Sequence, residues 1–293
     1  MERAQATGHL YAFVTVAIWS TAFVGNKVLL DFLTPIEIML YRFVLAYGVL
    51  LMIYPQWQLP TSLRNEGLFF LLGALGIFVY FLFENYALKY TQAANVGLFM
   101  GAIPLLTALL SHRLVPGERM RRTLLVGFAL AAAGMGMILF EERAFHLRFR
   151  GDVLALLGAL TFALYSTLLK RVPSACHSIV VARKSFFYGL VLMGLWCWIG
   201  NETLHLQPLK EPIVWGNLLY LGLFSSGLAF WLYQQGIERI GSIAASHYIY
   251  LVPLLTALTG VMVLGEQLTP TLLIAGTLIL AGLYLSIGGE AGS

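Results

Sequence analysis

The sequence predicts an all-α integral membrane protein whose ten transmembrane helices form two inverted five-helix repeats around a central cavity. Three observations lead to this fold class: an apolar composition, ten long apolar segments, and a six-residue string that occurs twice. Hydrophobic residues make up 59% of the 293 residues and charged residues only 11%, with a mean hydropathy of +0.81. A soluble domain carries about 25% charged residues to cover its surface, so most of this surface must face lipid.

Each apolar segment is close to the length of about 20 residues that a helix needs to cross a bilayer. Turn and charge signals separate the segments, as at 31–35 and 55–66, and no gap is long enough for a separate soluble domain. The first segment is kept as a span because no small-x-small cleavage site follows it before Asn26 and Lys27. The predicted spans are 9–30, 35–54, 67–88, 93–112, 122–140, 152–171, 177–200, 213–236, 242–263 and 270–288.

The distribution of Lys and Arg predicts the orientation, because cytoplasmic loops carry an excess of both. With the N-terminus inside, eleven fall on the cytoplasmic side: Arg3, Arg64, Arg113, Arg119, Arg121, Arg122, Lys170, Arg171, Arg183, Lys184 and Arg239. Five fall outside: Lys89, Arg143, Arg148, Arg150 and Lys210. We therefore expect both termini in the cytoplasm, and the pI near 9.1 requires no nucleic-acid partner.

The chain is internally duplicated. The string Pro-Leu-Leu-Thr-Ala-Leu occurs at 104–109 and again at 253–258, which is 149 residues further on. Other matching positions are Gly8 and Gly151, Lys27 and Lys170, and Arg42 and Arg183. The halves, 1–145 and 146–293, form one transmembrane domain and hold five spans each. Five is odd, so the second half enters the bilayer from the opposite side. Such inverted repeats share one site near the midplane, which suits alternating access.

Several motifs resemble the drug/metabolite transporter superfamily in its EamA branch, and most closely its YddG-type aromatic amino-acid exporters. They are Trp19-Ser-Thr-Ala-Phe-Val followed by Lys27, the stretch 35–46 with Arg42, Ala87-Leu-Lys-Tyr-Thr-Gln-Ala-Ala, Pro104 and Pro253 with Leu-rich tails, and the Gly-Glu pairs at 117–118 and 265–266. The resemblance covers nearly the whole chain. It implies ten spans around a central cavity, with the first, third, fourth, sixth, eighth and ninth spans enclosing it.

Two prolines stand in the middle of predicted spans. Pro104 and Pro253 each remove a backbone hydrogen bond and displace the carbonyl four residues earlier, at Met100 and Ile249. We expect the prolines to act as hinges beside the cavity. The alternative is a static kink that serves packing.

Polar residues within spans are candidates to bind the charged groups of a substrate. Glu84 and Asn85 lie in the third span. Glu84 is either a pathway residue that could carry a proton or a carboxylate paired with Lys89 or Lys27. The counterpart of Glu84 in the second half is Gln234 or Tyr233, neither of which can ionise. His247 is either a substrate contact or a neutral, hydrogen-bonded core histidine.

Arg42 and Lys27 could neutralise a substrate carboxylate. Alternatively, each belongs to an interfacial ion pair with Asp31 or Glu37, and Lys27 is better explained by snorkelling to the interface.

Mid-span aromatic residues predict an apolar or ring-bearing substrate, because they favour stacking and burial of apolar area. They are Trp19, Phe78, Tyr80, Phe99, Tyr165, Phe230, Trp231 and Tyr248. Lipid-facing packing is the alternative for some of them. The fifth and tenth spans carry small residues at near-helical spacing, such as Gly127, Gly134 and Gly282, and these predict close helix contact in a scaffold or oligomer interface.

The sequence lacks the motifs of the competing classes. It has two aspartates, scattered histidines, no His-Glu-x-x-His and no Walker-type loop, which argues against an enzyme, a metal site or an ATP-driven pump. It also has no filter-like string of a channel. A lipid-precursor flippase, or another metabolite or drug exporter of the same superfamily, is the closest alternative.

We therefore predict a secondary transporter of the inner membrane that exports aromatic or hydrophobic amino acids, as a monomer or homodimer without a cofactor. Predicted substrate-binding residues are Trp19, Tyr80, Glu84, Asn85, Phe99, Tyr165, Phe230, Gln234, His247 and Tyr248.

Overall fold

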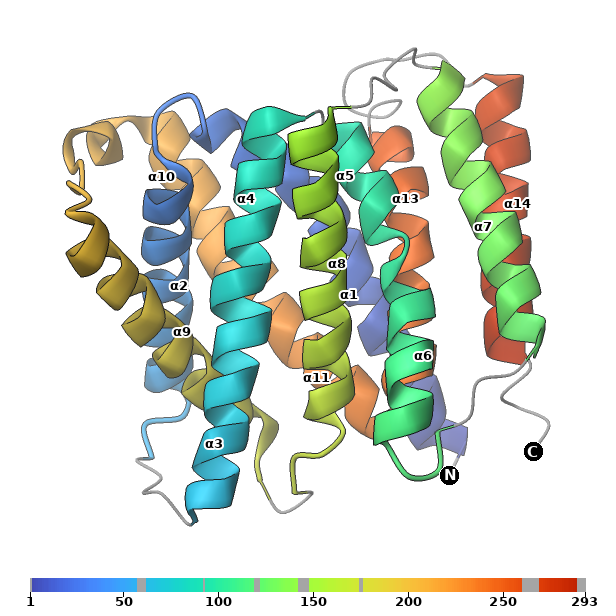
Figure 1. Cartoon of the computed structure of the whole chain (residues 1–293), viewed down its shortest axis with the longest axis horizontal. Helices are drawn as coiled ribbons and strands as arrows, with labels where there is room; N and C mark the ends of the chain where they lie inside the picture. The colour runs from blue at the N-terminus through green and yellow to red at the C-terminus, as the bar shows by residue number, and fades with distance from the viewer. Residues whose placement is uncertain are drawn as a thin grey trace.

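The structure, a computed structural model, describes residues 2–56, 62–91, 93–118, 122–141, 148–173, 176–259 and 269–288. All regular elements in these ranges are helical, and the long helices run roughly side by side in one bundle (Figure 1). The helices of the first half are α1 (Glu2–Leu29), α2 (Pro35–Ile53), α3 (Leu63–Leu72), η1 (Gly73–Val79), α4 (Tyr80–Tyr90), α5 (Ala93–Met100), α6 (Ile103–Leu114) and α7 (Arg122–Glu141).

The second half repeats this order of elements. It contains α8 (Phe149–Leu169), α9 (Ser178–Gly200), η2 (Gln207–Lys210), α10 (Pro212–Leu219), η3 (Tyr220–Leu228), α11 (Ala229–Ile240), α12 (Ser242–His247), η4 (Tyr248–Tyr250), α13 (Leu251–Thr259) and α14 (Pro270–Gly288). Helix α1 begins and α14 ends at the same edge of the bundle, whereas α8 begins at the opposite edge (Figure 1). We call these the α1 edge and the α8 edge.

Eight of the predicted spans are confirmed, within the described residues, as helices long and apolar enough to cross a membrane. The third and eighth are the longest, because α3, η1 and α4 join into Leu63–Tyr90, and α10, η3 and α11 join into Pro212–Ile240. The predicted fifth and ninth spans contain shorter apolar helices, Thr123–Ile138 and Ser242–Thr256. The prediction of ten crossings therefore stays a prediction for these two, and residues 260–263 of the ninth lie outside the described ranges.

The outer surface of the bundle is apolar. Large side chains such as Val24, Met52 and Leu280 are 58%, 74% and 53% exposed, whereas Arg42, Glu84 and other polar side chains are buried in the interior. Contiguous exposed apolar surface of this extent suits a lipid surrounding and not water. The fold is thus that of a multi-pass membrane protein.

Both long spans contain a π-helical segment, η1 in the first half and η3 in the second. A π segment widens the helix locally and often marks a functional region. Each packs through a glycine against the second span of the other half. A methyl group at Gly73 would lie 2.6 Å from the carbonyl oxygen of Ser185, and one at Gly222 would lie 3.1 Å from that of Arg42.

The two proline-containing spans are both interrupted just before their proline. Gly101 and Ala102 form a turn between α5 and α6, so Pro104 lies in the first turn of α6, where a missing N–H costs no helical bond. In the second half, the short 3₁₀ helix η4 separates α12 from α13, and Pro253 follows in α13. The predicted mid-span kinks are therefore breaks between two helices.

Helices α7 and α14 pack closely along one end of the bundle (Figure 1). A methyl group at Gly127 would lie 2.5 Å from the carbonyl oxygen of Gly282, and one at Gly134 would lie 2.6 Å from that of Ala275. Small residues thus bring the two backbones together. The predicted close helix contact of the fifth and tenth spans is made between these two spans themselves.

Candidate functional site

A small cavity lies at the centre of the bundle, where elements of both halves meet. Its volume is about 40 Å³, enough for only a few water molecules at about 10–15 Å³ each. A cavity of this volume is too small for a metabolite. Its lining comprises Trp19, Ala22, Phe23 and Asn26 of α1, Arg42 of α2, Tyr80, Phe81 and Glu84 of α4, Met100, Ile103, Phe162 of α8, Ser225 of η3, Phe230 of α11, Ile249 and Val252.

Aromatic rings from both halves form the cavity wall. The ring of Trp19 lies 5.5 Å from that of Phe162 and 5.4 Å from that of Phe230 (centroid distances), both edge-to-face. Tyr80 lies 4.9 Å from Phe162, and Phe81 lies 5.8 Å from Phe230. Pairs of aromatic rings at these distances attract each other, and the ring faces and edges that line the cavity can contact an apolar ligand.

One end of the cavity is polar and carries a positive charge. Arg42 is 1% exposed. Its Nε donates to Oγ of Ser226 at 2.8 Å, and its Nη atoms donate to Oγ of Ser225 at 3.2 Å and to Oδ1 of Asn26 at 3.4 Å. The guanidinium carbon also lies 4.5 Å above the ring centre of Phe81, a cation–π distance. The guanidinium is therefore held rigidly against the cavity.

The carboxyl group of Glu84 lies on the other side of the Asn26 amide. Nδ2 of Asn26 donates to Oε1 of Glu84 at 3.4 Å, so Asn26 connects Arg42 to Glu84. Oε2 of Glu84 is buried without a hydrogen-bond partner among the described residues. In the described part of the chain no ion pair within 4.0 Å joins the two charges. The cavity thus presents a guanidinium group and a carboxyl group, which lie on either side of Asn26.

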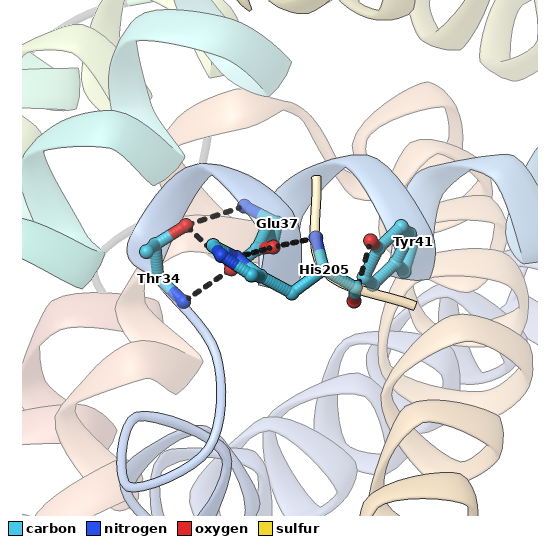
Figure 2. A network of polar contacts seen from close by, with 4 residues as sticks. All are labelled: Thr34, Glu37, Tyr41 and His205. Atoms are coloured by element: carbon cyan, nitrogen blue, oxygen red, sulfur yellow. Dashed lines mark hydrogen bonds and ion pairs between the residues drawn. The ribbon is translucent and has the colours of Figure 1, made fainter. Parts of the chain in front are cut away.

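The alternative pairing of Arg42 with Asp31 or Glu37 is not formed within the described residues, and Glu37 is engaged elsewhere (Figure 2). Oε2 of Glu37 accepts hydrogen bonds of 2.8 Å from the backbone N and from Oγ1 of Thr34, which caps α2. Oε1 accepts a hydrogen bond of 2.5 Å from the backbone N of His205 and lies 3.0 Å from Nδ1 of the same histidine. Glu37 therefore ties the α9–α10 loop to the start of α2.

Lys27 lies at the end of α1. Its Nζ donates to the carbonyl oxygen of Leu88 at 2.9 Å, which joins α1 to α4. The alternative pairing of Glu84 with Lys27 or Lys89 is not formed, since Glu84 is bound by Asn26.

Four of the ten predicted substrate-binding residues line the cavity: Trp19, Tyr80, Glu84 and Phe230. Nε1 of Trp19 donates to the carbonyl oxygen of Ser225 at 3.0 Å, which orients the indole. Tyr165 and Gln234 lie behind the wall, with Nε2 of Gln234 donating to the hydroxyl of Tyr165 at 3.2 Å. These two are brought together one layer outside the lining.

The remaining four predicted residues are not part of the lining. Nδ2 of Asn85 donates to the carbonyl oxygen of Phe81 at 2.8 Å within α4, and Phe99 packs against the core. His247 is buried against Tyr250, at 6.0 Å between ring centres. Tyr248 pairs through its hydroxyl with Nδ1 of His9 at 3.0 Å. A substrate role for these four in a wider cavity stays a prediction.

The breaks before the prolines supply four apolar lining residues. Met100 and Ile103 come from the first break and Ile249 and Val252 from the second. Pro104 and Pro253 stand directly beside this lining without being part of it. Their role as hinges stays a prediction.

Sequence reasoning missed part of the lining. Phe162 stands 143 residues after Trp19, the spacing of Gly8 and Gly151, and Phe81 stands 149 residues before Phe230. Applying the repeat spacing to each candidate would have found both. Asn26 and Ser225 carry no such signal, because their counterparts are the dissimilar Leu169 and Gly76.

The apolar outer surface, the long spans and the central cavity with buried charges define a multi-pass membrane transporter. The sequence profile of the EamA-like transporter family matches residues 6–140 and 149–288, one segment in each half. The chain belongs to the EamA-like transporter family. In the described part of the chain, no group of three His, Cys, Asp or Glu residues is placed to hold a metal ion.

The relatives of this chain are transporters. An uncharacterized transporter of Archaeoglobus fulgidus is 28% identical over 95% of this chain and 96% of its own length. A probable terminal-alkyne amino-acid exporter of Streptantibioticus cattleyicolor is 25% identical over 93% of this chain and 90% of its own. A biotin transporter of Escherichia coli is 26% identical over 61% of this chain and 60% of its own. A crystal structure with 22% identity covers 98% of this chain and 99% of its own, with a TM-score of 0.76, so the fold is shared.

Proposed function

We propose that this chain is a secondary transporter that exports aromatic or other hydrophobic amino acids by alternating access, as a YddG-type member of its family. One observation carries the proposal: the central cavity combines aromatic walls with Arg42 and Glu84 at one end. An amino acid has an apolar side chain for the rings, a carboxylate for the guanidinium and an ammonium group for the carboxylate of Glu84. The amino-acid exporter among the relatives is consistent with this substrate class.

The polar end of the cavity explains why a zwitterion suits the site better than a singly charged molecule. Two buried charges that are bridged only through an amide are incompletely neutralised, and a buried charge is costly unless it is paired. A zwitterion offers a counter-charge to each. A substrate with only one charge leaves Arg42 or Glu84 uncompensated. Asn26 and Ser225 can add hydrogen bonds to the same carboxylate.

Matching contacts in the two halves support the proposal that 1–145 and 146–293 are inverted repeats. Nζ of Lys27 donates to the carbonyl oxygen of Leu88, and Nζ of Lys170 donates to that of Ile237 at 3.1 Å. Lys27 and Lys170 are 143 residues apart and the two acceptors are 149 apart, the spacings of the duplicated positions. In this proposal the α1 edge faces the cytoplasm of a bacterial-type inner membrane, and the carrier works as a monomer or homodimer.

Uptake of labelled phenylalanine and tryptophan into proteoliposomes tests the substrate. We expect saturable uptake of both. Phenethylamine, which lacks the carboxylate, and 3-phenylpropionate, which lacks the amine, should compete about tenfold or more weakly than phenylalanine, because each leaves one buried charge unpaired. No flux of either amino acid would remove the proposed substrate. Competition by 3-phenylpropionate as strong as by phenylalanine would remove Glu84 as the ammonium site.

The same vesicles test coupling. Uptake measured with and without a pH gradient shows whether a proton moves with the substrate. Flux that is indifferent to the gradient would exclude Glu84 as a proton carrier while leaving its role in binding.

A further inference from the structure

Two glycine contacts join the two halves, one at each edge of the bundle. We infer that Gly8 and Gly151 are the closing points of the two gates and that a side chain at either position opens only its own gate. The inference rests on the proposed alternating access, because a gate requires a path to the cavity.

The first contact lies at the α1 edge. A methyl group at Gly8 would lie 2.7 Å from Cγ2 of Ile240 and 2.8 Å from Cβ of Arg239. Both distances are shorter than the separations that non-bonded carbon atoms adopt in proteins, where contacts of about 3.5–4.0 Å are favourable. Only glycine lets α1 and the end of α11 come this close. The guanidinium of Arg239 also lies 5.2 Å above the ring centre of Tyr11, which adds a contact between the same two helices.

The second contact lies at the α8 edge. A methyl group at Gly151 would lie 2.6 Å from Cβ of Thr91 and 2.9 Å from its backbone N. Oγ1 of Thr91 donates to Oδ1 of Asp152 at 3.1 Å. Asp152, the residue after Gly151, therefore adds a hydrogen bond to the same contact. The start of α8 is therefore packed closely against Thr91, the residue that follows α4.

The two contacts are equivalent by position in the repeat. Gly8 and Gly151 are 143 residues apart, and Ile240 and Thr91 are 149 apart. Each contact joins the first helix of one half to the end of the third span of the other half, at opposite edges of the bundle (Figure 1). Rocking of the halves therefore separates one contact while the other stays closed.

The cavity lies midway between these contacts. Trp19 follows Gly8 by 11 residues along α1, and Phe162 follows Gly151 by 11 residues along α8. Eleven residues of helix span about 16 Å. Because both contacts are closed around a cavity of about 40 Å³, the structure is an occluded form, and opening either contact gives one face of the membrane access to the rings.

Accessibility of a cavity cysteine tests the gates independently of transport. The background replaces both native cysteines (Cys176→Ser, Cys197→Ser), and Ala22→Cys provides a reporter in the lining. A membrane-impermeant maleimide is applied from each side of oriented vesicles. Gly8→Ala should raise labelling about tenfold from the side of the α1 edge only, and Gly151→Ala by the same factor from the other side only, since one added methyl in a packed contact shifts a two-state equilibrium by about this factor.

The matched control is Gly194→Ala in α9, where nothing lies within 4 Å of the added methyl group. It should label like the parent. Equal labelling of all variants, or an increase from the same side for Gly8→Ala and Gly151→Ala, would overturn the inference. Loss of substrate flux with side-specific labelling intact would instead remove the proposed substrate and leave the gates.

Cross-linking tests the same two contacts by a second measurement, in which a covalent bond holds each contact closed. Cysteine pairs Gly8→Cys with Arg239→Cys, and Gly151→Cys with Thr91→Cys, place their Cβ atoms close enough for a disulfide after a shift of about 1 Å. Each pair should form a disulfide on mild oxidation, and each disulfide should lower uptake at least about tenfold until it is reduced. Gly194→Cys with Arg239→Cys should form none. Oxidised pairs that still transport would exclude these contacts as gates.

Discussion

Arg42 and Arg183 occupy matching positions in the two halves but have different environments. Arg42 faces the cavity and is bound by Ser225, Ser226 and Asn26. Arg183 instead donates to the backbone carbonyl oxygens of Tyr54 and, at 2.9 Å, of Gln56, beyond the end of α2. The repeat thus supplies two buried arginines, of which one is available to a substrate carboxylate.

We predict that Arg42→Gln raises the KM for phenylalanine at least about tenfold, because it removes a charge-assisted partner of the carboxylate. It also leaves Glu84 buried without a counter-charge, which costs roughly 3–5 kcal/mol of stability and lowers Tm. Arg183→Gln is the matched control and should lower Tm without changing KM. Transport kinetics in proteoliposomes and thermal unfolding measure both effects. Equal KM values for the two variants would contradict the assignment of Arg42.

At the scale of elements, helices α7 and α14 form a closely packed pair that lies apart from the central cavity. Neither helix contributes to the cavity lining in the described residues, and the pair is held by backbone approach at Gly127 and Gly134. Gly136 lies on the same helix, two residues after Gly134, with nothing within 4 Å of an added methyl group. One helix therefore has a packed face and an open face.

This difference predicts that Gly134→Leu destabilises the protein, whereas Gly136→Leu does not. A side chain at Gly134 is forced against the carbonyl oxygen of Ala275 and the side chain of Ile279, and overpacking of this kind costs about 1–3 kcal/mol or more. Thermal unfolding of the two variants in the same detergent is the measurement. A Tm for Gly134→Leu equal to that of Gly136→Leu would show that the two helices do not depend on this contact.

At the scale of the whole molecule, the direction of the chain decides which edge of the bundle faces which compartment. Asp31 lies in the exposed turn after α1, and Pro116 lies in the exposed turn after α6. With α1 entering from the cytoplasm, the first turn is outside and the second is inside.

We therefore expect Asp31→Cys to react with an impermeant maleimide added to intact cells and Pro116→Cys to react only after the cytoplasmic face is exposed. Both side chains are exposed at helix ends, so neither substitution disturbs packing. Reversed labelling would invert the orientation. Labelling of both from the same side would contradict the odd number of crossings expected between these two turns.

The repeat and the spans were readable from the sequence because hydrophobic length and spacing are local properties. A helix must satisfy its own backbone in lipid, so about 20 apolar residues determine a crossing without reference to the rest of the chain. The breaks were less well predicted. Pro104 and Pro253 indicated kinks, whereas the structure has a break before each proline, at Gly101–Ala102 and at η4, and each proline lies near the start of the helix that follows.

The sequence by itself determined the membrane class, the family, the duplication and four lining residues. Only the tertiary structure decided which polar residues share the cavity. Arg42 lies there beside Asn26 and Ser225, and Gln234 and His247 lie behind or beyond its wall. The physical reason is that an apolar span shows no reliable periodic difference between its lipid face and its inner face. The rotation of each helix is set by its partners, such as the glycine contacts of Gly73 and Gly222.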